Sequence, residues 1–171
     1  MSDETLSLDQ LYQAVEQHLT THLPGVQAVT VWPNISDRVA LPAVFLELAE
    51  VEPGTDIGTG ETTLVCRFEA RIIVDPIKPH HQRQAVQLAT QLAVLLRAQT
   101  WGLPVEPAEF VQAQQDWTQP HLDGYTVWLV EWTQQVYLGV EEWPWPDQPP
   151  GMLLVGFNND VKEDFVPAED M

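Results

Sequence analysis

The stretch ETTLVCRFEARIIVD, residues Glu61–Asp75, decides the expected fold of this chain. Apolar residues occupy one set of alternate positions, and charged or polar residues occupy most of the other set. Alternation with a period of two predicts a β-strand with one buried face and one polar face. The apolar set comprises Leu64, Cys66, Phe68, Ala70, Ile72 and Val74. Because a typical strand has about 5–6 residues, we expect this longer one to cross a whole sheet.

The polar face of this strand alternates in charge through Arg67, Glu69 and Arg71. One interpretation is an ordinary solvated face, since most runs of charged residues lie on protein surfaces. The other is a face that meets a second subunit, where Arg67 or Arg71 pairs with acids of the neighbour. Exposed ion pairs contribute about 0–1 kcal/mol each, so such pairs would set the register of an interface. Both interpretations stay open from sequence.

Composition limits the classes of partner. The chain has 171 residues, which suits one domain with an appendage, and 25 acids against 7 bases give a formal net charge of −18. Such a charge argues against binding nucleic acid through its phosphates, which needs clustered Lys and Arg.

Cys66 is the single cysteine of the sequence and is expected to be a buried, inert thiol. The N-terminus MSDETLSLDQ has no apolar run, so we expect neither a signal peptide nor membrane association.

The N-terminal third predicts a helix and two strands. Ser7 and Gln10 form a capping-box pattern before an apolar stripe with spacings of three and four, and Pro24-Gly25 ends the helix. Strands are expected at residues 26–32 and 42–50. The glycine-rich turn that follows has no phosphate-loop motif, so it predicts a flexible hairpin tip.

The chain after Asp75 predicts a second helix and two further strands. The helix is expected from about Pro79 to Thr100, where leucines and alanines form an apolar stripe, and Gly102 is placed to cap its end. We expect this helix to cover the apolar face of the long strand. A strand of poor alternation is expected at residues 108–115. Tyr125–Leu138 is apolar on both faces in its first half. That pattern is typical of a central strand, and we place it beside Glu61–Asp75.

Residues 1–139 therefore form the expected domain, and residues 140–171 form an acidic, proline-rich C-terminal arm. Proline at this density prevents a helix or a central strand. Large apolar residues in the arm, Trp143, Trp145, Phe157 and Phe165 among them, would anchor it to a surface. That surface is either its own domain or a neighbouring subunit, and the sequence leaves both open.

No motif for catalysis or for a metal is present in the sequence. Serine occurs only at positions 2, 7 and 36, outside any nucleophile motif. His18 and His22 have helical spacing but lack the Glu and the third ligand of a zinc signature. We therefore expect neither an enzyme nor a protein that holds a metal or a cofactor.

Four stretches carry a resemblance to a known family. They are L-x-x-L-Y-Q-A-V-x-x-H-L-x-x-H-L-P-G at Leu8–Gly25, L-P-A-V-F-L-E-L at Leu41–Leu48, G-T-G-E-T-x-L-V-x-R-F-E-A-R at Gly58–Arg71 and L-x-G-Y-x-V-W-L-V-E-W-x-Q at Leu122–Gln134. In these stretches the chain resembles the tail terminators, or tail completion proteins, of Mu-like phages and prophages. The stretches cover most of residues 7–139, and none is a catalytic motif.

The resemblance implies an α+β fold: a mixed or antiparallel sheet of about five strands with two helices packed on one face. It implies a structural virion protein, assembled in the host cytoplasm, that forms a homo-oligomeric ring, typically a hexamer. The ring would cap the tail tube, stop its polymerisation and contact the connector proteins of the head–tail junction. DNA would pass through its lumen without specific binding.

Two other functions stay open from sequence. One is a head–tail joining protein that binds the connector and does not cap the tube. The other is an acidic DNA mimic that inhibits a basic DNA-binding protein, since a net charge of −18 suits such a protein as well. Against the mimic, arginines interrupt the acids of Glu61–Asp75, and many other acids lie in the arm and loops.

Overall fold

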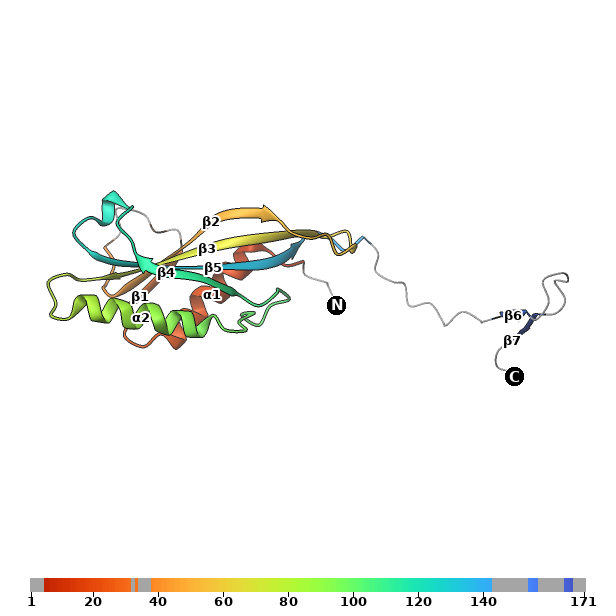
Figure 1. Ribbon diagram of the computed structural model, residues 1–171, viewed down its shortest axis with the longest axis horizontal. Coiled ribbons are helices and arrows are strands. Elements are labelled where there is room, and N and C mark those ends of the chain that lie inside the picture. Colours follow the sequence, from red (N-terminus) through yellow and green to blue (C-terminus); the bar gives the residue numbers. More distant parts are fainter. Residues whose placement is uncertain (1–4, 32, 34–37, 143–153, 157–164, 168–171) are drawn as a thin grey trace.

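The computed structural model describes residues 5–31, 33, 38–142, 154–156 and 165–167. A five-stranded sheet forms one layer, and the two helices, α1 (Leu8–His22) and α2 (His81–Leu95), cover one of its faces (Figure 1). Because one strand is parallel and the others are antiparallel, the sheet is mixed. The predicted α+β architecture is confirmed.

The strands follow the order β1-β2-β3-β5-β4 across the sheet. Their bounds are Ala28–Val31 for β1, Ala43–Pro53 for β2, Thr62–Val74 for β3, Glu109–Gln115 for β4 and Thr126–Leu138 for β5. β1 runs parallel to β2, and β3 pairs with β5 over the whole length of both strands. The two long strands therefore lie side by side in the middle of the sheet, as their sequence patterns predict.

The start of α1 follows from its capping residues. The Ser7 hydroxyl accepts a hydrogen bond from the backbone N–H of Gln10, and the Gln10 side chain accepts one from the backbone N–H of Ser7. This capping box satisfies two backbone donors that a helix start otherwise leaves free. The stripe then places Leu11, Val15 and Leu19 in the core, where all three are fully buried.

The end of α2 differs from the prediction. The helix stops at Leu95 with Leu96 as its C-cap, and Gly102 lies beyond the turn that follows. Ala98 and Trp101 both take left-handed backbone conformations in this turn. The early reversal brings the Trp101 ring into the core, where its Nε1 donates a hydrogen bond to Oε1 of Gln134 at 2.7 Å. The helix thus ends at the last leucines of the stripe, and the turn that follows adds Trp101 to the core.

The core lies between the helices and the apolar side of β3 and β5. Phe68 stacks on Trp132 with ring centroids 5.3 Å apart, and Tyr12 of α1 meets the edge of Phe68. These aromatic residues bury large apolar areas, which is the main source of stability in such a layer. Cys66 is 1% exposed, and burial raises the pKa of its thiol. The expectation of a buried thiol is confirmed.

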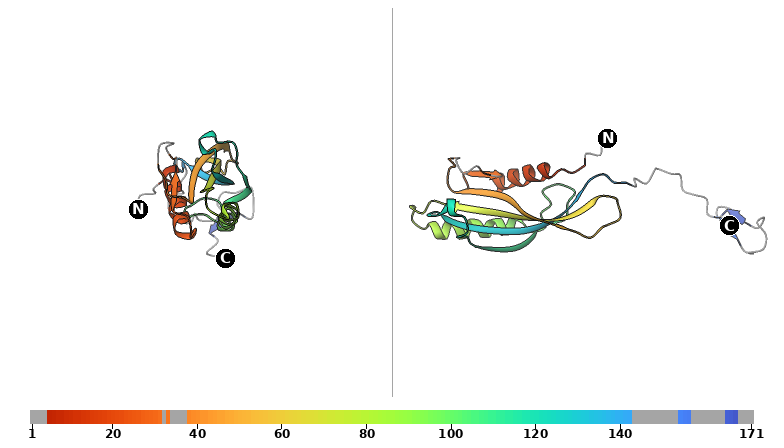
Figure 2. Two further views of the ribbon diagram at one scale, coloured as in Figure 1. Left: turned by 90° about the vertical axis from the view of Figure 1, so that its left-hand side faces the viewer. Right: turned by 90° about the horizontal axis from the view of Figure 1, so that it is seen from above.

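Strands β2, β3 and β5 continue past both helices to a hairpin turn (Figures 1 and 2). We call this part of the molecule the hairpin end; it comprises the turn at residues 54–61, the strand ends beside it and residues 139–142. Gly60 has φ +87°, and a Cβ there would lie 2.9 Å from the backbone nitrogen of Glu142. The Glu142 N–H also donates to the carbonyl of Thr59 at 2.9 Å. The segment after β5 therefore closes against the hairpin turn.

In the C-terminal arm the structure describes two short strands, β6 (Leu154–Gly156) and β7 (Phe165–Pro167). They pair antiparallel with each other and form a sheet separate from the main one. Trp143, Trp145 and Phe157 lie outside the described residues, as does the side chain of Phe165. Whether the arm binds its own domain or a neighbour stays a prediction.

Candidate functional site: the charged face of the sheet

The sheet face opposite the helices carries a row of three glutamates. In the strand register Glu69 of β3 lies directly between Glu47 of β2 and Glu131 of β5. Like charges directly opposite each other destabilise a sheet. The row therefore needs cations beside it, and the flanking residues on the same face of β3 are Arg67 and Arg71. We call these five residues and Asp116, which bonds to Arg71, the charged network.

Arg71 is the centre of this network and binds three carboxylates. Its Nε lies 2.8 Å from Oδ2 of Asp116, its Nη1 lies 2.9 Å from Oε2 of Glu47, and its Nη2 lies 2.6 Å from Oε2 of Glu69. The residue is only 5% exposed. A planar guanidinium with several fixed donors suits such a site, since each donor meets its own acceptor. Arg71 thereby ties β2 and β3 to the segment that follows β4.

Arg71 and Asp116 both stay charged although they are buried. Burial alone would raise the pKa of Asp116, but hydrogen bonds from Thr118 and Arg71 outweigh burial and hold that pKa below its ordinary value. Burial likewise acts to lower the pKa of Arg71, and its bonds to Asp116 and Glu69 outweigh that effect and raise it. Thr118 contributes through both its backbone N–H and its hydroxyl, at 2.9 and 2.6 Å from Oδ1 of Asp116.

Arg67 lies on the other side of the glutamate row and is more open. Its Nε is 3.3 Å from Glu50, its Nη1 is 3.9 Å from Glu131, and its side chain is 38% exposed. The Glu131 carboxylate also accepts a hydrogen bond from the amide of Gln112 on β4. Arg67 can therefore exchange partners at little cost, whereas the partners of Arg71 are fixed by burial.

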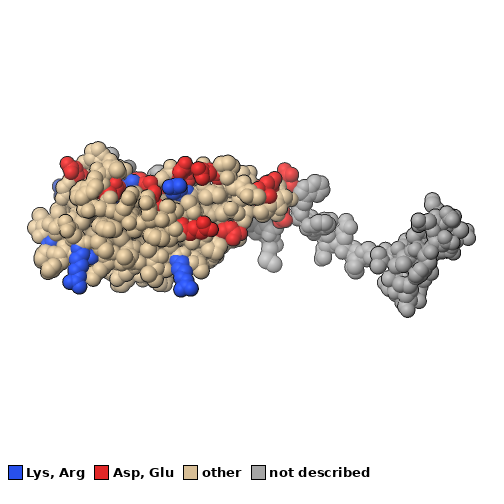
Figure 3. Space-filling model, in the orientation of Figure 1, with Lys and Arg blue, Asp and Glu red and all other residues tan. Residues whose placement is uncertain are grey.

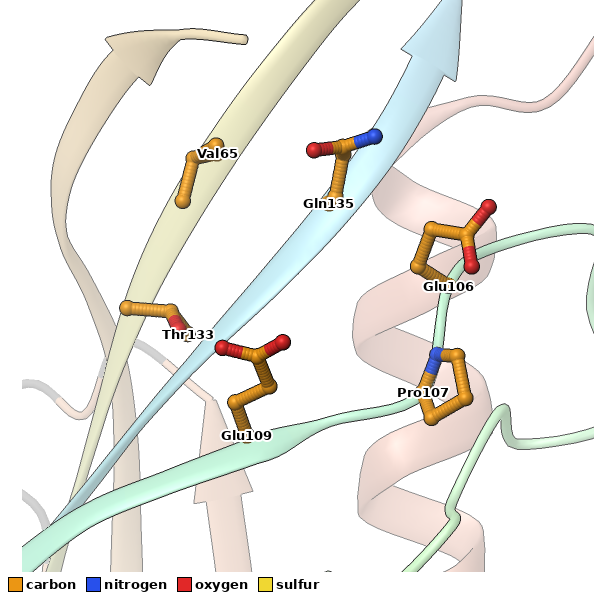
Figure 4. A pocket seen from close by; sticks show the side chains of 6 residues that line it. All are labelled: Val65, Glu106, Pro107, Glu109, Thr133 and Gln135. Atoms are coloured by element: carbon orange, nitrogen blue, oxygen red, sulfur yellow. The ribbon is translucent and has the colours of Figure 1, made fainter.

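A hollow of about 360 Å³ lies beside this network, toward the hairpin end (Figure 4). We call it the Glu106–Glu109 hollow; its lining residues are Val65, Glu106, Pro107, Glu109, Thr133 and Gln135. Val65, Thr133 and Gln135 come from β3 and β5, Glu106 and Pro107 come from the segment that leads into β4, and Glu109 is the first residue of β4. The hollow combines two apolar side chains with two carboxylates on the helix-free side of the sheet.

One carboxylate of the hollow is held in place by an adjacent phenol. The Tyr137 hydroxyl donates to Oε1 of Glu106 at 2.8 Å, and the Gln135 amide donates to the Tyr137 oxygen at 2.9 Å. The pKa of Tyr137 is raised, first by its bond to Glu106 and also by the charge of Glu61. Three acidic or phenolic groups thus lie close together at the hairpin end.

The structure brings together the predicted residues Arg67, Glu69 and Arg71 on one face. An ordinary solvated face does not describe Arg71, which is buried and bonded within its own chain. Contact of these residues with another subunit stays a prediction, as do the roles of Trp143, Trp145, Phe157 and Phe165. Sequence analysis missed Asp116, because it lies 45 residues from Arg71 and only the register of β4 and β5 brings the two together.

The helical side shows little chemistry of its own. His18 and His22 stack with ring centroids 4.1 Å apart, and burial, followed by the charge of His22, lowers the pKa of His18. Among the residues that the structure describes, no three His, Cys, Asp or Glu side chains are grouped as they would be around a metal ion. In the same residues, no helix is long and apolar enough to cross a membrane.

Comparison with known proteins gives a limited result. No protein-family model matches the chain, and no curated protein matches it. One similar solved structure is a PVC sheath/tube terminator of an extracellular contractile injection system, determined by cryo-EM in the extended state. The TM-score is 0.48 and the sequence identity is 13%, over 93% of this chain and 66% of that chain. A likeness this distant carries no conclusion about function.

Proposed function

We propose that this protein is a structural component of a phage tail that closes the end of the tail tube as a homo-oligomeric ring, a hexamer in the family it resembles. In this role it stops the tube from polymerising further. It then forms part of the junction between tail and head in the virion. Its partners are other copies of itself, the tail-tube protein and the head–tail connector.

The resemblance of Leu8–Gly25, Leu41–Leu48, Gly58–Arg71 and Leu122–Gln134 to tail terminators is the first support for this proposal. These stretches contribute α1, the start of β2, most of β3 and the first half of β5. They are therefore neighbours in the central sheet and on its helical face, and they form one unit. Fold similarity alone does not define a function, so the surface of the unit must support the proposal as well.

The observation that carries the proposal is the chemistry of the helix-free face. Acids outnumber bases across its centre, where Glu47, Glu69 and Glu131 form a row, and Arg71 is neutralised by its own chain. In a ring whose helices face outward, the glutamate row at the centre of this face lines the lumen, and the Glu106–Glu109 hollow lies nearer the hairpin end. An acidic lumen repels DNA phosphates, so DNA passes through without sticking to the wall.

Labelling of tube ends tests the proposal. Tubes are assembled from the cognate tail-tube protein and mixed with gold-labelled protein, and the positions of the gold are recorded by electron microscopy. Label at tube ends supports a terminator. Label along the tube walls, or none on the tubes, contradicts it.

The head–tail joining alternative gives a different result in the same assay. A protein that binds only the connector leaves tubes unlabelled and labels isolated connector rings. A DNA mimic labels neither and is retained on a column that carries a basic DNA-binding protein. The terminator, the joining protein and the DNA mimic are thus distinguished by whether the labelled protein binds tube ends, connector rings or the column.

A further inference from the structure

The free charges of this protein separate along its long axis. Described residues 50–66, 103–110 and 133–142, which include the hairpin end and the Glu106–Glu109 hollow, contain no Lys or Arg. Their exposed or half-buried acids are Glu50, Glu52, Asp56, Glu61, Glu106, Glu109, Glu141 and Glu142. On the face shown in Figure 3, the described surface nearest the hairpin end carries acidic side chains and no basic ones, whereas side chains of both signs lie over the rest. This end therefore attracts cations.

Among the described residues, three of the four cations without an ion pair lie at the other end of the long strands, and the fourth, Arg97, follows the C-terminal end of α2. Arg38 precedes the start of β2, Lys78 lies in the turn after β3, and Arg83 lies in the first turn of α2. All three are exposed, and we call them the basic end. Since β3 runs from Thr62 at the hairpin end to Val74 at the basic end, the two ends are about 40 Å apart at the usual rise per residue, and Val65 of the hollow is about 30 Å from Val74. A single copy cannot bring them together.

The Glu106–Glu109 hollow suits a long basic side chain. Val65 and Pro107 provide apolar walls for a methylene stem, and the carboxylates of Glu106 and Glu109 provide acceptors for the charged head. Arg67, two positions from Val65 on β3, is turned toward Glu50 and Glu131. The hollow thus has acceptors for a cation and receives none from the described part of its own chain.

The basic end also carries an apolar anchor. Ile77 is 89% exposed and precedes Lys78 directly. An exposed isoleucine beside a lysine gives a contact that combines apolar burial with charge, and the apolar part supplies most of the affinity. At the hairpin end Val140 is 70% exposed and offers a matching apolar surface.

We infer that the hairpin end of one copy, through its Glu106–Glu109 hollow, binds the basic end of a second copy, with Lys78 and Arg83 as the cations. Such a contact joins two different surfaces of the same chain. A head-to-tail contact of this kind closes into a ring when its rotation permits. This contact supplies the two surfaces that join neighbouring copies in the proposed ring. Only the closing of these copies into a ring rests on the proposed function.

A second copy is favoured over another occupant because both complementary surfaces belong to this chain. The net charge of −18 makes copies repel each other at long range, so association needs local pairing of this kind. A basic partner protein would instead bind the hairpin end and leave Lys78 and Arg83 unused. The experiment therefore changes both ends separately.

The test uses two charge-reversed forms of the full chain. Glu106→Lys with Glu109→Lys reverses the hollow, and Lys78→Glu with Arg83→Glu reverses the basic end. All four side chains are exposed, and near-UV circular dichroism checks that each form is folded, since Glu106→Lys removes the bond from Tyr137. Sedimentation velocity, without tail tubes, measures self-association of each form. Each alone is expected to associate about tenfold more weakly than the natural chain or worse, because like charges now meet.

Mixing the two forms is the decisive measurement. In the mixture, the hollow that carries the two new lysines meets the basic end that carries the two new glutamates. The other contact in the mixture joins an unchanged hollow to an unchanged basic end. Association is therefore expected to return to near the level of the natural chain. It is also expected to weaken from about 0.05 to 0.5 M salt, because the Debye length falls from above 10 Å to below 5 Å. An interface elsewhere on the molecule gives no such recovery.

Two further variants complete the test. Asp9→Lys with Glu16→Lys makes on α1 the same change in net charge as the reversed hollow and should leave association unchanged. Ile77→Ser should weaken it with no change of charge. A natural chain that stays monomeric at all concentrations and salts, or a mixture that does not recover, overturns the inference. Because no tube is present, either result leaves the proposed binding to tube ends standing.

Discussion

Nε of Arg71 lies 2.8 Å from Oδ2 of Asp116, and this contact fixes the central strand β3 to the segment after β4. Both residues are nearly inaccessible to solvent, at 5% and 8% exposed. Such a pair does not by itself make a fold more stable than apolar packing would. Its effect is to specify one register for the strands that it joins, because loss of either partner leaves a buried charge.

Replacement Asp116→Asn is expected to lower the free energy of unfolding by about 3 kcal/mol, the lower end of the range for broken buried pairs, because Glu69 and Glu47 still neutralise Arg71. Urea denaturation measures the change. Asp123→Asn, at an exposed carboxyl nearby, serves as the control and should change stability by less than about 0.5 kcal/mol. Equal effects of the two variants would contradict the role given to Asp116.

The same pair predicts a pH dependence. Since the folded-state pKa of Asp116 lies below its unfolded value, its stabilisation is present above about pH 4 and is lost as the pH falls through the lowered folded pKa. The difference in stability between the natural chain and Asp116→Asn should therefore be constant near neutrality and shrink below about pH 4. Denaturation series at several pH values measure it. A difference that persists unchanged in acid would show that ionised Asp116 is not the source.

A buried amide at the start of the hairpin extension predicts a second stability effect. Gln134 is 1% exposed; its Oε1 accepts from Trp101, and its Nε2 donates to the carbonyls of Gln99 and Glu106. Gln134→Leu removes the partners of the Trp101 Nε1–H and of the Glu106 carbonyl, whereas the Gln99 carbonyl still accepts from the N–H of Ala108; the loss should lower the free energy of unfolding by about 3 kcal/mol. Gln114→Leu on exposed β4 is the matched control and should have little effect. Thermal and urea unfolding report both.

The C-terminal arm predicts a separation of folding from assembly. Deletion of residues 140–171 should leave a folded domain, because the helices and all five strands of the main sheet end before residue 140. Assembly should weaken, since the tryptophans of the arm are the expected anchors. Near-UV circular dichroism reports the fold and light scattering reports the mass; Trp143→Ala with Trp145→Ala in the full chain repeats the test. An unfolded deletion product would make the arm part of the core.

The sequence predicts those features that depend on local pattern. The alternation of Glu61–Asp75, the capping box at Ser7 and the two-sided apolar run of Tyr125–Leu138 each correspond to an element with the expected burial. The contacts of Arg71 were not predictable, because they join residues far apart in the chain. The end of α2 was predicted too late, because the helix stops with the last leucines of the stripe and the turn that follows places Trp101 in the core.

Growth of the tail tube in the presence of this protein tests the central claim most directly. Tube subunits are polymerised with and without it, and tube lengths are measured by electron microscopy. If the protein is a terminator, an amount equal to the number of tube ends arrests growth and gives short tubes with a narrow length distribution. Fresh tube subunits added afterwards do not lengthen these tubes. Tubes that keep growing at the same rate, with protein in excess over tube ends, would contradict the proposed function.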